Sequence, residues 1–182
     1  MTDLLPFLVV GVTSGSLYGL AGLGLTLTYR TSGVFNFGHG AVAALGAFVF
    51  FTLHFDHGLP WPLALLLATI GVGTVAGLVL ERLGRVFVAG GAAASIMGTV
   101  ALLLLIQGLL TLAYGSATRN FPVFLGSGGF AVGAVRVEWH QVAAVIMAAA
   151  AAVALYAFLQ WSAMGRSIRA VVDNPELLDL CG

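Results

Sequence analysis

The chain contains no lysine, a single cysteine and few charged residues of any kind. Without lysine it has neither the phosphate-binding lysine of a P-loop nor a lysine that could form a Schiff base. The single cysteine, Cys181, forms no internal disulfide and supplies no CxxC pair for metal or redox chemistry. Charged residues make up 8% of the sequence, whereas a soluble domain carries about 25%. These shortages exclude a freely soluble domain and ATP chemistry at a P-loop of this chain.

The sequence also lacks any excess of positive charge. Its 7 arginines balance 7 acidic residues, so the formal net charge is zero. A basic patch that binds nucleic acid needs such an excess to neutralise phosphates, and this class of protein is therefore excluded. Hydrophobic residues instead make up 60% of the chain, with a mean hydropathy of +1.06. This composition is typical of a polytopic membrane protein.

Charged residues divide the sequence into five apolar runs. A transmembrane helix needs roughly 20 predominantly apolar residues. The expected spans are residues 4–29, 41–55, 57–80, 96–114 and 139–165. We therefore predict an all-α, polytopic transmembrane helix bundle of about five spans. The first run is read as a retained helix, because Asp3 stands where a signal peptide has basic residues and the run is too long.

The arginines predict the orientation of the bundle. The positive-inside rule favours the topology that places more arginines in the cytoplasm. If the segment after the fifth span is cytoplasmic, the inner arginines are Arg30, Arg82, Arg85, Arg166 and Arg169, against Arg119 and Arg136 outside. The N-terminus is then external. We expect a transmembrane domain over residues 1–161, with an external loop at 115–141, and a cytoplasmic segment at 162–182.

Two features of this domain concern packing rather than chemistry. Gly11, Gly15 and Gly19 repeat every four residues along one face of the first span, a pattern that lets two membrane helices approach closely. The external loop ends in alternating residues, which predicts either a short hairpin on the outer surface or, as the alternative, a disordered linker.

Histidines and acids offer few candidates for catalysis or metal binding. The group His54-Phe55-Asp56-His57 has side chains that bind metals, but no further ligand is nearby, so we read it as a solvated loop between spans two and three. No Ser/His/Asp set suggests itself. We therefore predict no catalytic residues, no metal site and no cofactor, and a protein that is not an enzyme.

Polar residues lie where the second span should begin. Asn36 and His39 stand among glycines in the stretch Asn36-Phe37-Gly38-His39-Gly40. Glycines permit a break in a membrane helix, which is tolerated only beside protein or a water-filled cavity, and polar side chains at that depth are candidates for function. The alternative is an ordinary helix start, with Asn36 capping the second span through its side-chain oxygen. The residues alone leave both interpretations open.

The segment after the fifth span changes abruptly in composition. Ile168, Val171 and Val172 predict a short amphipathic helix, and Asp173-Asn174-Pro175 predicts its end and the start of another. A pair of short helices with exposed leucines is typical of a docking element for another protein. A helix lying on the lipid surface is the alternative.

Together these two regions resemble the permease subunits of ATP-binding-cassette importers for branched-chain amino acids, of the LivH type. The resemblance rests on residues 19–27, on Asn36-Phe37-Gly38-His39-Gly40 and on Gly46-Ala47-Phe48. It rests equally on Gly165-Arg166-Ser167-Ile168-Arg169-Ala170, which leads into Asp173-Asn174-Pro175-Glu176.

The resemblance implies ATP-driven alternating access in the inner membrane of a bacterium. Its implied partners are a second permease subunit of the LivM type, two cytoplasmic ATP-binding subunits, an external solute-binding protein, the amino-acid substrate and the lipid bilayer. Asn36, Phe37, Gly38, His39 and Gly40 would line or gate the pathway. The residues implied in coupling to the ATPase are Gly165, Arg166, Arg169, Asp173, Asn174, Pro175, Glu176 and Gly182. Such permeases continue through further spans, so we expect a truncated form, or remaining spans supplied by another chain.

Two other functions remain compatible with the sequence. A permease for urea or short amides would look similar, because the external binding protein largely sets the selectivity. A structural or channel-like membrane subunit would need no ATPase.

Overall fold

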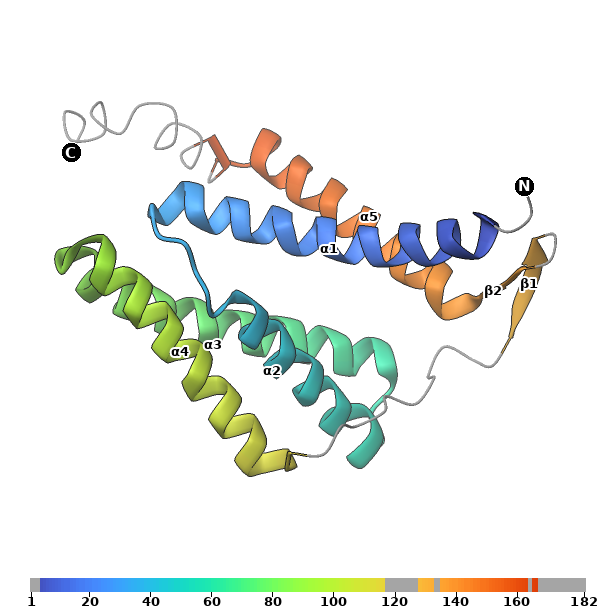
Figure 1. Cartoon of the computed structure of the whole chain (residues 1–182), viewed down its shortest axis with the longest axis horizontal. Helices are drawn as coiled ribbons and strands as arrows, with labels where there is room; N and C mark the ends of the chain where they lie inside the picture. Colours follow the sequence, from blue (N-terminus) through green and yellow to red (C-terminus); the bar gives the residue numbers. More distant parts are fainter. Residues whose placement is uncertain (1–3, 117–127, 133–134, 164, 167–182) are drawn as a thin grey trace. The chain divides into compact units, whose positions relative to one another are not determined.

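The computed structural model of the chain describes residues 4–116, 128–132, 135–163 and 165–166. Figure 1 shows its helices and a two-stranded hairpin. The elements in chain order are α1 (Leu5–Ser32), α2 (His39–Phe51) with the π-helical turn η2 (Thr52–Asp56), α3 (Trp61–Ala89), α4 (Gly91–Tyr114), β1 (Gly129–Val132), β2 (Val135–Glu138) and α5 (Trp139–Trp161).

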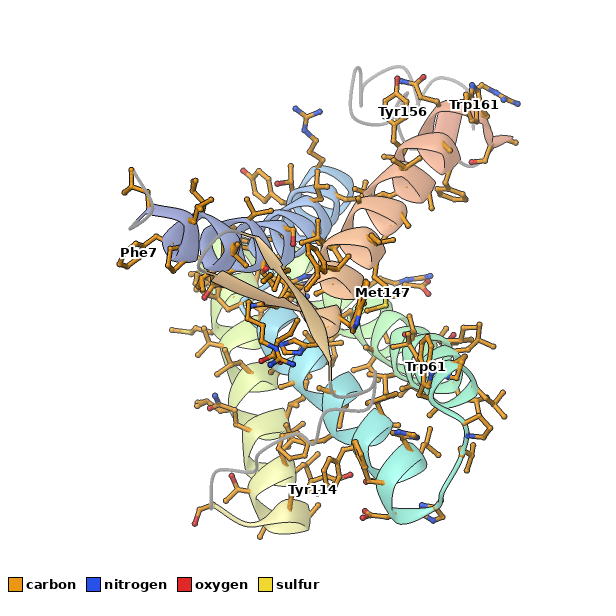
Figure 2. The ribbon with its side chains drawn as sticks, turned by 90° about the vertical axis from the view of Figure 1, so that its right-hand side faces the viewer. Phe7, Trp61, Tyr114, Met147, Tyr156 and Trp161 are labelled. Atoms are coloured by element: carbon orange, nitrogen blue, oxygen red, sulfur yellow. The ribbon has the colours of Figure 1, made fainter. Side chains whose placement is uncertain are left out.

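Among the residues that the structure describes, five helices are long and apolar enough to cross a membrane, counting α2 and its π-helical turn as one. The predicted all-α, multi-pass bundle is therefore confirmed. Aromatic residues at span ends are typical of the membrane interface, and Figure 2 shows Trp61 at the start of α3 and Trp161 at the end of α5. The orientation across the membrane stays a prediction.

The helices form two compact units. One unit contains α1, the hairpin and α5, and the other contains α2, α3 and α4. This division reflects how the helices pack with one another. It does not test the expected boundary between a transmembrane domain ending at residue 161 and a cytoplasmic segment beginning at residue 162, which stays a prediction.

In the second unit, each of the three helices packs against the other two (Figure 1). The core of this unit is a stripe on α4, Leu102, Ile106 and Leu110, which packs with Ala41 of α2. The three α4 residues are spaced by four and so lie on one helix face. Most other large side chains of the unit are exposed, as expected for helices that present apolar surface to lipid or to further helices.

His54, Phe55 and Asp56 continue the helix, so the predicted loop was wrong for these three residues, whereas His57 is exposed and follows the helix as its C-cap. Residues 52–56 continue α2 as a π-helix, in which the N–H of His57 donates to the carbonyl of Thr52 at 3.0 Å. Both histidines stabilise this end through Nδ1, His54 to the carbonyl of Leu59 at 2.7 Å and His57 to that of Thr52 at 2.9 Å. Within the described ranges, no three His, Cys, Asp or Glu side chains are grouped to hold a metal.

Tyr114 at the end of α4 supports the same end of α2 (Figure 2). Its hydroxyl lies 2.7 Å from that of Thr52 and donates to the carbonyl of Phe48 at 3.3 Å. The rings of Phe48 and Tyr114 also contact, with centroids 4.6 Å apart. These hydrogen bonds give partners to the two hydroxyls and to the carbonyl of Phe48, at the point where the α-helix changes to a π-helix.

In the other unit, the external loop contains the hairpin rather than only a linker. Its strands pair antiparallel, with Phe130 opposite Val137 and Ala131 opposite Arg136. Val137 is buried whereas Arg136 is exposed, because successive side chains point to opposite faces. The N–H of Trp139 donates to the carbonyl of Gly128, which ties the hairpin to α5. Hairpin formation is thus confirmed over residues 129–132 and 135–138, and its place outside the membrane stays a prediction.

The glycine row of α1 has an open face. A Cβ atom built on Gly11, Gly15 or Gly19 would meet nothing within 4 Å among the described residues. The predicted close helix contact of this face stays a prediction.

Candidate functional site

The candidate site is the break between α1 and α2, residues 33–38. Asn36 is only 4% exposed, and its side-chain oxygen accepts a hydrogen bond from the N–H of Gly38 at 3.0 Å. Its backbone carbonyl accepts from the N–H of His39 at 3.2 Å, and the carbonyl of Gly38 accepts from Val42 at 3.0 Å. Asn36 therefore accepts hydrogen bonds from two backbone N–H groups at the point where the break ends and α2 begins.

The predicted alternative, in which Asn36 is the N-cap of the second span, was wrong by two residues. The N-cap of α2 is Gly38, which has no side chain to accept a capping bond. The oxygen of Asn36 satisfies the N–H of Gly38 instead. A buried backbone N–H in an apolar environment costs free energy when it is unpaired, so this bond is needed where the helix begins.

Two hydroxyls on α4 complete the site. The hydroxyl of Thr99 lies 3.3 Å from the carbonyl of Phe35 and 3.1 Å from that of Ile96, and it donates to both. Ser95, one turn earlier, donates to the carbonyl of Gly91 at 3.1 Å. Thr99 is 3% exposed and Ser95 4%, so both are as deeply buried as Asn36. We call Asn36, Ser95 and Thr99 the polar cluster below.

Sequence reasoning missed Ser95 and Thr99, although a signal was present. They are spaced by four residues within an otherwise apolar helix, and this spacing places both on one helix face. Leu102 continues that face by three residues and belongs to the core. A small polar pair on the buried face of a membrane helix is typical of a contact with another backbone.

Gly38 lies where the break is close to α4. A Cβ atom at this position would lie 3.2 Å from the side-chain oxygen of Asn36, 3.4 Å from Leu102 and 3.5 Å from the carbonyl of Thr99. The glycine thus leaves just enough room for the break to lie against α4.

Gly38→Val should therefore destabilise the second unit. The added side chain has to displace Leu102 or the backbone of α4, and overpacking of this kind costs about 1–3 kcal/mol. The measurement is the thermal unfolding midpoint in detergent. Gly46→Val is the matched control, because a Cβ at Gly46 meets nothing within 4 Å. Equal unfolding midpoints for the two variants would contradict the close approach at Gly38.

The other predicted pathway residues occupy different surroundings. Phe37 is 42% exposed and its ring contacts that of Phe35, with centroids 4.9 Å apart. His39 is half-buried at the start of α2, and Gly40 is exposed. The structure therefore separates the stretch into a buried part, Asn36 and Gly38, which holds the break, and a more exposed part around it.

An apolar groove runs between the three helices of this unit. Its volume is about 370 Å³, and its lining includes Leu102 of α4, Val42 of α2 and Val75 of α3. The lining offers no side-chain group that could bind the charged ends of an amino acid. The groove is thus a surface for apolar groups.

Of the predicted coupling residues, the structure describes Gly165 and Arg166. Gly165 is buried and Arg166 is exposed, just beyond the end of α5. The others, Arg169, Asp173, Asn174, Pro175, Glu176 and Gly182, lie outside the described residues.

Comparisons with known proteins agree with this arrangement. Residues 7–182 match the family model described as "Branched-chain amino acid transport system / permease component". The chain is 28% identical to the high-affinity branched-chain amino acid transport system permease protein BraD of Pseudomonas aeruginosa, over 96% of this chain and 61% of that protein. It is 27% identical to the corresponding protein LivH of Escherichia coli, over 94% of this chain and 60% of LivH.

The chain thus spans about three fifths of the length of these curated relatives. No solved structure matches it at a significant level.

Proposed function

Because the chain belongs to the family of permease components of branched-chain amino acid transport systems, we propose that it is a permease subunit of an ATP-driven importer for branched-chain or related amino acids. The observation that carries this proposal is the extent of the family match, from residue 7 to residue 182. The match includes the polar break, all five helices and the segment beyond α5. The chain is a multi-pass membrane protein, and the inner membrane of a bacterium is its proposed location.

The proposed role is binding and conformational change without covalent catalysis. The partners are a second permease subunit of the LivM type, two cytoplasmic ATP-binding subunits and an external solute-binding protein. Residues 162–182 would dock on an ATP-binding subunit, so that its movements reach the transmembrane helices.

Within this role, the break between α1 and α2 is the proposed site on the solute pathway. Asn36 bonds the backbone within the break, and Thr99 bonds the break to α4. Phe37, His39 and Gly40 are left more exposed than Asn36 and Gly38, and they are the residues proposed to line or gate the pathway. An ionisable side chain in a membrane span costs free energy, so residues of this kind are candidates for function. His39, at the start of α2, is one of them.

The test is uptake by proteoliposomes that contain this chain, its partner permease and the ATP-binding subunits, with the solute-binding protein added outside. We expect uptake of labelled leucine that requires ATP and the binding protein. Uptake of urea or a short amide in place of leucine would support the alternative substrate class. Leucine flux without ATP would indicate a channel-like subunit and would contradict the proposal.

A further inference from the structure

Ser162 joins α5 to the turn that follows it. Its backbone is extended, with φ −78° and ψ 153°, and residues 163, 165 and 166 are helical again. The N–H of Ser162 donates to the carbonyl of Phe158 at 3.0 Å and closes α5. Its hydroxyl accepts from the N–H of Gly165 at 2.8 Å, and its carbonyl accepts from the N–H of Arg166 at 3.2 Å. One residue thus ends α5 and caps the next turn.

Gly165 packs directly on the last turn of α5. A Cβ atom at this position would lie 2.4 Å from the carbonyl oxygen of Leu159 and 2.5 Å from that of Phe158. Both neighbours are backbone atoms, which cannot move aside as the end of a flexible side chain can. The two helical segments therefore meet backbone to backbone, at an angle that only glycine permits.

Arg166 adds a third contact across the same junction. Its guanidinium donates to the carbonyl of Trp161 at 3.1 Å. The last carbonyls of a helix have no partner within the helix, and a cation beside them is favourable. The carbonyl end of α5 is thus held by the segment that follows it.

We propose that these contacts make residues 158–166 a fixed elbow, which passes displacement of the segment beyond α5 to α5 itself, with Ser162 and Gly165 as its positioning residues. The inference rests on the proposed function, in which that segment docks on the ATP-binding subunit. A loose joint would let the docked segment move while α5 stayed still. Because these contacts hold the two segments together, movement of the segment beyond α5 also moves α5.

The test is Ser162→Ala in the complete importer, measured as ATP molecules hydrolysed per leucine imported. Loss of the capping bond should raise this ratio about fivefold. Ser162→Thr keeps the hydroxyl and should restore the wild-type ratio. Ser16→Ala is the matched control, because the hydroxyl of Ser16 donates to a backbone carbonyl within α1 and lies at no junction. A merely structural role would lower the amount of assembled importer and leave the ratio per importer unchanged.

A second measurement keeps the test independent of assembly yield. Spin labels at Val153→Cys and Ser167→Cys, in a Cys181→Ser background, should give a narrow distance distribution that Ser162→Ala broadens and Ser16→Ala does not. An unchanged ratio and distribution for Ser162→Ala, with uncoupling by Glu176→Lys, would overturn the elbow and leave the docking role intact. If Glu176→Lys also fails to uncouple, the proposed function itself is contradicted.

Discussion

Glu176→Lys is expected to lower uptake strongly while the protein remains in the membrane. Glu176 follows Asp173-Asn174-Pro175 in the segment proposed to dock on the ATP-binding subunit. Reversal of a charge within a protein interface places like charges together or leaves a partner unpaired, at a cost of several kcal/mol. We therefore expect transport per assembled importer to fall about 30-fold or more. ATP hydrolysis should lose its dependence on leucine and on the binding protein.

The matched control for this variant is Asp179→Lys. It makes the same reversal in the same segment, three residues away and outside the family motif. It should retain most of the uptake. Undiminished uptake by Glu176→Lys, or an equal loss in both variants, would count against a specific docking role for Glu176.

Thr99→Val should weaken the contact between the break and α4. Valine has nearly the shape of threonine but lacks the hydroxyl, so the carbonyl of Phe35 loses the bond that holds the break to α4. A hydrogen bond of this kind contributes about 0.5–1.5 kcal/mol to stability. We expect a lower unfolding midpoint, together with a loss of leucine uptake that exceeds the loss of protein from the membrane.

Two further variants separate the hydroxyl from the general effect of the substitution. Thr99→Ser restores a donor and should recover most of both properties. Thr111→Val removes a hydroxyl that bonds only the preceding turn of α4, at an exposed position, and should change stability by less than about 0.5 kcal/mol. If Thr99→Val matches Thr111→Val in stability and uptake, the polar cluster has no special role.

The number of spans could be predicted from the sequence because charged residues interrupt the apolar runs. The residues at which the helices begin and end could not be predicted in this way. Helix α3 continues past Glu81 and Arg85 to Ala89, and these two side chains form an exposed ion pair one turn apart. Charged groups at the end of a span can reach the aqueous interface on long side chains, so a charge limits the apolar core of a span but does not end the helix.

The same limit explains the misread histidine group. His54 and His57 are polar residues before a glycine, which resembles a loop when only composition is considered. The π-helical turn begins at Thr52, whose hydroxyl contacts that of Tyr114, 62 residues away in the sequence. Local pattern carries no information about such a partner.

The sequence predicted one part of the candidate site, the residues of the break, but not the residues of α4 that it contacts. Asn36 and Gly38 stood out because an amide and glycines are unusual at the start of a membrane span. The role of Asn36 in holding the break, and the contribution of Thr99, follow from the contact between the break and α4. Hydroxyl residues are common in membrane helices, and the spacing of Ser95 and Thr99 alone does not show which backbone Thr99 contacts.

The side of the membrane on which Ser167 lies tests the central claim most directly, because coupling to an ATPase requires the segment beyond α5 to be cytoplasmic. The measurement is labelling of Ser167→Cys, in a Cys181→Ser background, by a thiol reagent that cannot cross the membrane. Ser116→Cys, just beyond α4, is the control for the opposite side. The account predicts that Ser167→Cys reacts only after the membrane is permeabilised, whereas Ser116→Cys reacts in intact cells. Labelling of Ser167→Cys from outside in intact cells would contradict it.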